Sequence, residues 1–298
     1  MPVLNVYFRT RSLHLSLYFL SMQNFRVGLS PCPNDTFMFD ALLHNKINLE
    51  NCVFTPVMED VQQLNERAMR ADLEITKMSF FAYTKVANEY KILNAGSALG
   101  KNCGPILISK KPIDKDADLS HLKVCIPGAN TTANLLLSIF YPQLKNKTAI
   151  LFSDIETALL NGDYDAGLII HENRFTYKQK GLHKIVDLGE AWQQDTGYHI
   201  PLGCIVVKRS MEEAVQKKID KLLQKSVKYA FSHPDSVMKY VRQHAQEMDE
   251  TVMKQHIVLY VNNYSIDLGL QGKTAIAQLF KKGQEAGLIG ELPDDIFV

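Results

Sequence analysis

Short apolar runs alternate along the chain with amphipathic helical patterns, and this alternation constrains the fold more than any other feature. The predicted strands of the first part are 25–29, 53–56, 73–78, 91–94 and 104–109. Those of the second part are 123–126, 148–152, 167–170, 184–188 and 202–207. Helices predicted between them include one from near Thr36, 60–69, 80–87, 131–140 and 154–160. Strands separated by helices are typical of βαβ units, so the sequence predicts an α/β fold with parallel strands.

Two α/β units followed by a helical tail account for the rest of the 298 residues. The tail helices are predicted at 211–231, 234–243, 250–260 and 274–285. Their apolar periodicity is that of ordinary core packing, so the tail is interpreted as structural, without catalytic residues. The two units could be consecutive domains, or the second could be inserted into the first.

Insertion is favoured because apolar runs opened by glycine and proline lie at both ends of the middle unit, at 104–109 and 201–207. They suit strands that cross between lobes, as in a periplasmic-binding-protein-like fold with two α/β lobes joined by two crossover strands and a ligand cleft between them. The predicted first lobe is discontinuous, 24–110 with 206–298, and the second lobe is 111–205.

Composition excludes several classes of function. Lys and Arg number 33 and Asp and Glu 32, so no net charge favours nucleic acid or an anionic membrane. The five cysteines include no Cys-x-x-Cys pair, which argues against a zinc site or a disulfide framework and fits a reducing cytoplasm. Motifs for dinucleotides, ATP and catalytic zinc are missing, so no cofactor and no metal are predicted.

Residues 1–23 are predicted to be an N-terminal extension that is disordered or not native. Arg9 and Arg11 precede the apolar run 13–20, which mimics a secretory signal. The run is interrupted by polar residues, has no Ala-x-Ala cleavage pattern and is too short to span a bilayer. Met22, directly before the first strand, is the alternative start.

His171 is the candidate for chemistry, because it follows the predicted strand 167–170 directly. Ligands of open α/β sheets bind outside the carboxyl ends of strands, and histidine transfers protons near neutral pH. The alternative is a structural histidine, and the role of Glu172 is left open. His199, near the return crossing, could support the site. Six further histidines are expected to be solvated, namely His44, His121, His183, His233, His244 and His256.

Three strand-to-helix turns carry small polar residues, at 30–36, 77–79 and 130–132. Backbone N–H groups and hydroxyls at helix N-termini stabilise anions, so a carboxylate is the predicted ligand. The alternative is plain helix capping, against which the doubled Thr131 and Thr132 argue. Asn34, Asp35 and Ser79 are further candidates. Cys32, between two prolines, is interpreted as a small buried cysteine rather than a nucleophile, because no base neighbours it in sequence.

Together these motifs resemble the 1,4-dihydroxy-6-naphthoate synthases of the futalosine route of menaquinone biosynthesis. The resemblance rests on 30–37, 77–79, 128–133 and 167–172, is extended by 196–197 and 200–203, and covers the chain from about residue 25. It implies a type II periplasmic-binding-protein fold in a cytoplasmic enzyme. That enzyme is a lyase that converts cyclic dehypoxanthine futalosine into 1,4-dihydroxy-6-naphthoate and a three-carbon product without metal or organic cofactor.

The resemblance also assigns residues. His171 corresponds to the proton acceptor, and the substrate-binding positions are Lys77, Met78, Ser79, Thr131 and Thr132. Rival interpretations are a solute-binding protein for a small carboxylate, the sister enzyme chorismate dehydratase, and a ligand-sensing domain, although no DNA-binding segment is attached. The His-Glu pair and the Pro-Cys-Pro-Asn-Asp loop favour the naphthoate synthase. The chain is expected to be a monomer or a homodimer.

Overall fold

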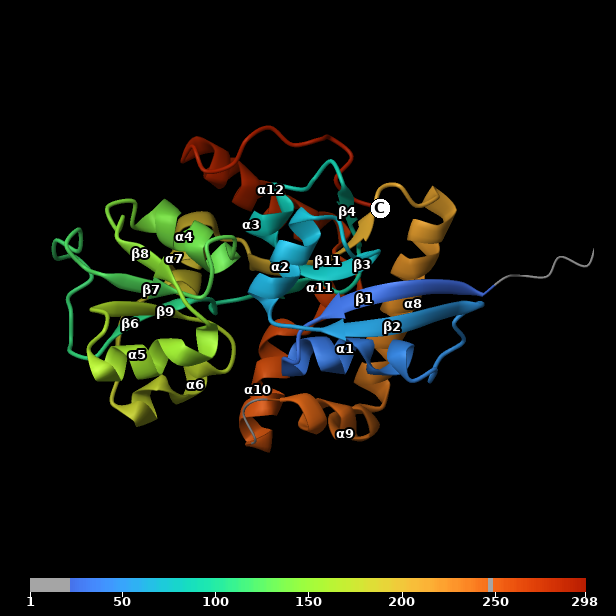
Figure 1. Cartoon of the computed structure of the whole chain (residues 1–298), viewed down its shortest axis with the longest axis horizontal. Coiled ribbons are helices and arrows are strands. Elements are labelled where there is room, and N and C mark those ends of the chain that lie inside the picture. Colours follow the sequence, from blue (N-terminus) through green and yellow to red (C-terminus); the bar gives the residue numbers. More distant parts are fainter. Residues whose placement is uncertain (1–21, 246–248) are drawn as a thin grey trace, which may run out of the picture.

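The computed structural model describes residues 22–245 and 249–298, and most of the predicted N-terminal extension lies outside these ranges. Two sheets divide the strands, as Figure 1 shows. The first has the order β2-β1-β3-β11-β4, with β5 paired to β11, and the second has the order β10-β6-β9-β7-β8. We call the first sheet, together with the helices packed around it, the first lobe. The second sheet and its helices are the second lobe.

The elements of the first lobe come from both ends of the chain. Its strands are β1 (Gln23–Leu29), β2 (Cys52–Met58), β3 (Ile75–Ser79), β4 (Tyr90–Ile92), β5 (Ala98–Gly100) and β11 (Ile200–Lys208). Its helices are α1 (Pro33–Leu43), α2 (Val61–Met69), α3 (Phe80–Tyr83), α8 (Glu213–Ser232), α9 (Pro234–His244), α10 (Glu250–Tyr260), α11 (Asn263–Ile266) and α12 (Gly269–Glu285). β1 begins at Gln23, inside the predicted extension, because the Gln23 amide donates to the Asn51 carbonyl at 2.9 Å.

The second lobe is built from the middle of the chain. Its strands are β6 (Ile106–Ser109), β7 (Val124–Ile126), β8 (Lys147–Ala149), β9 (Ala166–Ile169) and β10 (His183–Asp187). Its helices are α4 (Thr132–Phe140), α5 (Ile155–Asn161), α6 (Asn173–Thr176) and α7 (Leu188–Thr196), with short 3-10 helices at Phe152–Asp154 and Tyr177–Lys180.

Both sheets are mixed rather than wholly parallel. β1 runs parallel to β2 and β3, and β7 runs parallel to β8 and β9. β11 is antiparallel to β3, β4 and β5, and β6 is antiparallel to β9 and β10. The antiparallel strands are those that follow a crossing between lobes. Two strands of one sheet run parallel when a helix joins them in a βαβ unit. β6 and β11 each follow a strand of the other sheet, so this rule does not apply to them.

The chain leaves the first sheet after β5 and returns to it with β11. We therefore propose that the crossings lie at 101–105 and 197–199, several residues before the predicted boundaries. One buried apolar cluster includes Leu107 and Leu168 of the second sheet together with Met78, Cys204 and Val206 of the first. The two lobes thus share part of their core.

Several predicted elements differ in the structure. The strand expected at 148–152 is β8 at Lys147–Ala149 followed by a 3-10 helix, and the helix expected at 80–87 ends at Tyr83. β5 and α7 were not predicted from the sequence. The start of α7 carries a local signal, because the Asp187 carboxylate accepts hydrogen bonds from the amides of Gly189, at 2.8 Å, and Glu190, at 3.3 Å.

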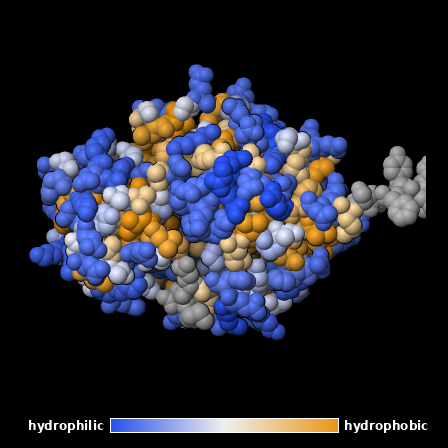
Figure 2. Space-filling model, viewed as in Figure 1, coloured by the Kyte–Doolittle hydropathy of each residue, from blue (hydrophilic) through white to orange (hydrophobic). Residues whose placement is uncertain are grey.

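The helical tail packs against the first lobe. α8 and α9 cover α1, and α10 contacts both α1 and β5 (Figure 1). Figure 2 shows a largely hydrophilic face with scattered apolar residues. Within the two described ranges, no helix combines the length and the apolar character that crossing a membrane requires.

Candidate active site

A cavity between the lobes collects most of the predicted site residues. Residues from both lobes line it, and small-molecule sites are often found at such interfaces between domains. The predicted residues that line it are Asn34, Lys77, Ser79, Thr131, Thr132 and His171. Met78 and Asp35 are completely buried and are not part of the lining, so neither side chain is placed to touch a ligand.

His171 lies where β9 ends and has a left-handed backbone, with φ of 56°. A bulky residue rarely adopts this conformation, and strained backbones of this kind occur preferentially at functional sites. The ring lies edge-on to Phe152, with 5.0 Å between ring centroids. Burial lowers the pKa of His171 to about 4, with the Lys77 charge acting in the same direction and Asp35 opposing it. The imidazole is therefore neutral at pH 7 and able to accept a proton.

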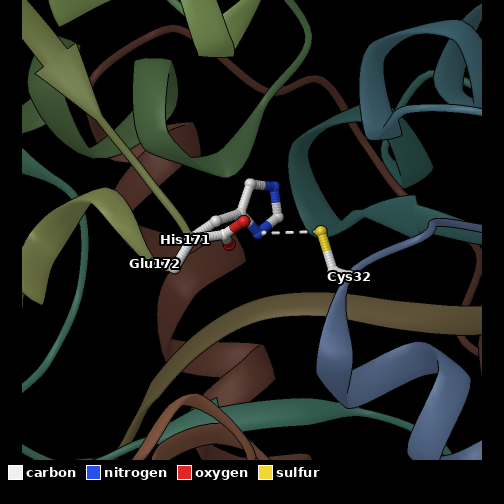
Figure 3. Close-up of side chains that lie close together, drawn as sticks. All are labelled: Cys32, His171 and Glu172. Carbon is white, nitrogen blue, oxygen red and sulfur yellow. Dashed lines mark hydrogen bonds between the residues drawn. The ribbon is translucent and has the colours of Figure 1, made fainter. Parts of the chain in front are cut away.

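Cys32 is the N-cap residue of α1, and its thiol points toward the His171 ring (Figure 3). The Cys32 Sγ lies 3.5 Å from Nδ1 of His171, although the two residues are 139 positions apart in sequence. No base neighbours Cys32 in sequence, but the fold places the His171 imidazole beside it. Burial raises the pKa of the Cys32 thiol, with Glu172 and Asp35 adding to the effect, so the thiol stays protonated. Cys32 is not among the lining residues, which argues for a partner of His171 rather than a nucleophile.

Cys32, His171 and Glu172 also form a group that could hold a metal ion. One ligand atom from each lies within 4.8 Å of the others (Figure 3). Sulfur, imidazole nitrogen and carboxylate oxygen are zinc ligands. A thiol must lose its proton to bind a metal, and the raised pKa of Cys32 opposes that loss. The expectation that the site needs no metal stays a prediction.

Asp35 holds Lys77 from behind the cavity wall. Asp35 accepts hydrogen bonds from the Ser30 amide at 3.1 Å and the Ser30 hydroxyl at 2.7 Å, and from Nδ2 of Asn34 at 3.1 Å. It also forms an ion pair with Lys77 of β3. This network satisfies the carboxylate, so Asp35 positions Lys77 instead of binding substrate. The Oδ1 of Asn34 is buried and has no hydrogen-bond partner within the described ranges, which leaves one acceptor on the wall.

Ser79 is held by a residue that the sequence analysis missed, Asn65 of α2. The Ser79 amide donates to Oδ1 of Asn65 at 2.9 Å, and Nδ2 of Asn65 donates to the Ser79 hydroxyl at 3.2 Å. Within the described part of the chain the Ser79 side chain does not cap α3. Its hydroxyl proton therefore stays available to a ligand. Asn65 is completely buried between Leu64 and Ala68, and a polar residue on the apolar face of a predicted helix is the signal that could have identified it.

The hydroxyls of the paired threonines are already in use. Thr131 caps α4 by accepting from the Asn134 amide at 3.2 Å, and it donates to the Gly128 carbonyl at 2.8 Å. Thr132 donates to the Leu202 carbonyl of β11 at 2.7 Å, a bond that joins the two lobes. The doubled hydroxyls therefore form one cap and one link between lobes. The first backbone N–H groups of α4, those of Thr132 and Ala133, have no carbonyl partner within the helix. They can therefore donate to a ligand.

The cavity also contains His256 and Tyr260 of α10, which the sequence analysis assigned to a tail without catalytic residues. His256 was expected to be solvated, but it is 1% exposed. The signal that could have identified it is the spacing of Met253, His256, Ile257 and Tyr260, which places all four on one buried face of the helix. His199 instead contacts Tyr264, with 5.0 Å between ring centroids, and is not part of this cavity.

The sequence matches a known family and two named relatives. The family is described as "Menaquinone biosynthesis", and the match covers residues 25–285. A Thermus thermophilus protein is 40% identical over 277 residues, 93% of this chain and 100% of that protein. A Streptomyces coelicolor protein is 37% identical over 281 residues, 93% of this chain and 98% of that protein. Both relatives are named "1,4-dihydroxy-6-naphtoate synthase".

The chain belongs to the menaquinone biosynthesis family. Solved structures confirm the fold class for this family member. A protein from Archaeoglobus fulgidus has a TM-score of 0.84 and 31% identity, and the match covers 89% of this chain and 98% of that one. The periplasmic aliphatic sulphonate binding protein of Escherichia coli has a TM-score of 0.63 at 15% identity, covering 93% and 98%. That likeness shows the periplasmic-binding-protein fold alone.

Proposed function

We propose that this member of the menaquinone biosynthesis family is a 1,4-dihydroxy-6-naphthoate synthase, a lyase that acts on cyclic dehypoxanthine futalosine with His171 as general base. The observation that carries the proposal is the position of His171. It lies at the end of β9, in the same cavity as Ser79 and the start of α4. One group that accepts a proton thus shares a cavity with several that can bind an acid.

The substrate carboxylate binds to donors from both lobes. Lys77 and the Ser79 hydroxyl come from the first lobe, and the N–H groups of Thr132 and Ala133 come from the second. Because Asp35 already balances the Lys77 charge, the amides and the hydroxyl supply much of the attraction. Met78 forms part of the hydrophobic core behind this wall, and Asp35 orients Lys77.

Substrate binding also adjusts the base. Burial and Lys77 hold the pKa of His171 at about 4, too low for an effective base at neutral pH. An anionic ligand nearby favours the charged form and raises this pKa toward the working range. A base of this kind contributes about 10²–10⁴-fold in rate, and positioning with exclusion of water supplies the rest.

Contact between the lobes keeps water out of the cavity. The Thr132 hydroxyl bonds to Leu202, and Lys85 of the first lobe donates to Asn130 of the second. Both bonds lie beside the cavity wall that α4 provides. Closure of two lobes around a ligand is the usual device of this fold. The reaction needs no organic cofactor in this proposal, and the enzyme works in the cytoplasm.

The test is incubation of the purified protein with cyclic dehypoxanthine futalosine, followed by absorbance of the naphthoate product. Product formation that is abolished in His171→Ala and retained in His183→Ala supports the proposal, because His183 is an exposed histidine at the start of β10. Binding without turnover would instead indicate a solute-binding protein. Turnover of chorismate in a parallel assay would indicate the sister enzyme chorismate dehydratase.

A further inference from the structure

His256 is a buried polar residue that faces the cavity and that the proposed reaction does not yet use. It is 1% exposed, and its ring centroid lies 6.0 Å from that of His171, with the ring planes 83° apart. Its Nδ1 is buried without a hydrogen-bond partner among the residues that the structure describes. Buried polar atoms are nearly always paired, so a buried histidine that lines a cavity and has an unpaired nitrogen is free to form a hydrogen bond with a ligand.

The helix that carries His256 is held firmly in place. Asp249 caps α10 by accepting from the Thr251 amide at 2.7 Å and the Val252 amide at 3.2 Å. Met253 and Ile257, on either side of His256 in the helical repeat, belong to the buried core that includes α1. Tyr260, one turn further on, lies edge-on to the His256 ring with 5.0 Å between centroids. The ring is therefore fixed in direction before any ligand binds.

The charge state of His256 follows from its surroundings. Burial lowers its pKa well below the ordinary value, and the nearby His171, Lys77 and Arg174 act in the same direction. A neutral imidazole carries one N–H donor and one acceptor nitrogen. The two histidines of the cavity are thus both neutral, which allows one to accept a proton while the other donates a hydrogen bond.

A carbon–carbon cleavage begun by a general base, as the proposed lyase reaction would be, is accelerated by such a donor. His171 removes a hydroxyl proton of the substrate, and the electron pair of that O–H bond forms the carbonyl of the departing three-carbon fragment. The pair of the broken carbon–carbon bond moves onto a ring carbonyl oxygen. The proton held by His171 then returns to this oxygen, which becomes a hydroxyl of the dihydroxynaphthoate. Negative charge develops on the ring oxygen in the transition state, where a fixed donor has its largest effect.

We infer that His256 is a second catalytic residue, whose imidazole N–H donates a hydrogen bond to the oxygen that receives this electron pair. The inference rests on the proposed function. It places the base and the donor on adjacent walls of the cavity, one at the end of a second-lobe strand and the other on a tail helix of the first lobe. Contact between the two lobes brings the two side chains into one cavity.

The experiment compares three variants of the full chain with wild type, using cyclic dehypoxanthine futalosine as substrate. His256→Phe keeps a flat ring without a donor, and His256→Gln restores an N–H donor. His183→Gln is the control at an exposed histidine. We expect His256→Phe to lower kcat by about 10²–10³-fold, as loss of one oxyanion donor does elsewhere, with KM changed by less than about threefold. His256→Gln should recover at least about tenfold of the loss, and the melting temperatures should agree.

Two results would overturn the inference while the proposed function stands. One is wild-type turnover together with a His256→Phe kcat within about threefold of it, a change too small for a lost oxyanion donor. The other is an equal loss in both His256 variants accompanied by a lower melting temperature, which would show a structural role. Wild type without turnover would contradict the proposed function itself, and the inference with it.

Discussion

The two walls of the cavity bind a ligand by different means. The first-lobe wall presents side chains, Lys77 and Ser79, and each is held by a buried polar partner, Asp35 or Asn65. The second-lobe wall presents the backbone at the start of α4 and one strained residue, His171. In the proposed function, the first-lobe wall therefore binds through side chains that are held in place by buried partners, whereas the second-lobe wall binds through backbone N–H groups and carries the general base.

The substitution expected to change kcat most is at His171, on the second-lobe wall. His171→Ala removes the base, and we expect kcat to fall by about 10²–10⁴-fold while binding of a naphthoate product analogue stays close to that of wild type. Absorbance assays and an equilibrium titration measure the two quantities. Near-normal product formation by this variant would show that His171 is not the general base. The second-lobe wall would then differ from the first only in how it binds the ligand.

A large effect on stability, rather than on rate, is expected on the first-lobe wall. Asp35→Asn leaves the Lys77 ammonium buried without its counter-ion, and breaking such a pair typically costs about 3–5 kcal/mol of unfolding free energy. Urea unfolding measures the change. The control is Glu213→Gln, which breaks an exposed ion pair with Lys217 and should leave the unfolding free energy almost unchanged, because water and salt screen such pairs. Equal losses in the two variants would show that the Asp35 network does not organise this wall.

Smaller effects are expected from the hydroxyls. Ser79→Ala removes a donor available to the ligand, so affinity for a naphthoate analogue should fall by about tenfold, close to the free energy of one hydrogen bond. Thr132→Val breaks the bond to Leu202, and we expect a loss of less than about threefold in affinity, because the α4 backbone stays in place. Thr274→Val, on the exposed face of α12, is the control. The reverse order would show that the second lobe supplies affinity through its side chains.

Acid should weaken the folded state through the histidines of the cavity. The folded pKa of His171, about 4, lies below the ordinary value of 6.5, so folding favours the neutral form. Its contribution to stability is complete above about pH 6.5 and is lost as the pH falls toward 4. His256 contributes in the same direction. Unfolding free energies measured between pH 7 and pH 4.5 should decline less steeply in His171→Asn, and an unchanged slope would contradict a lowered pKa of His171 in the folded state.

No effect is expected from metal removal. Treatment with a chelator followed by desalting should leave turnover unchanged, because the Cys32 thiol near His171 stays protonated. Turnover and bound zinc are measured before and after treatment. Activity that is lost with the metal and restored by zinc would instead assign Cys32, His171 and Glu172 to a metal site.

The sequence predicted the features that depend on local order. A strand that ends at His171 and a helix that begins beside Thr131 can both be read from a few neighbouring residues. The pairing of Asp35 with Lys77 could not, because 42 positions separate them and only the pairing of strands in the first sheet joins them. His256 was missed for a related reason. Periodicity shows which face of α10 is buried, but not that this face meets a cavity shared with β9.

The left-handed backbone of His171 has an unusual consequence for protein engineering. Glycine adopts φ near 56° without steric cost, whereas histidine and alanine do not. The His171→Gly variant should therefore unfold at a higher temperature than the His171→Ala variant, although both lack the imidazole. Improving thermal resistance at this position and preserving turnover are opposing aims, as is common where selection for activity has kept a conformation that the fold alone would not choose.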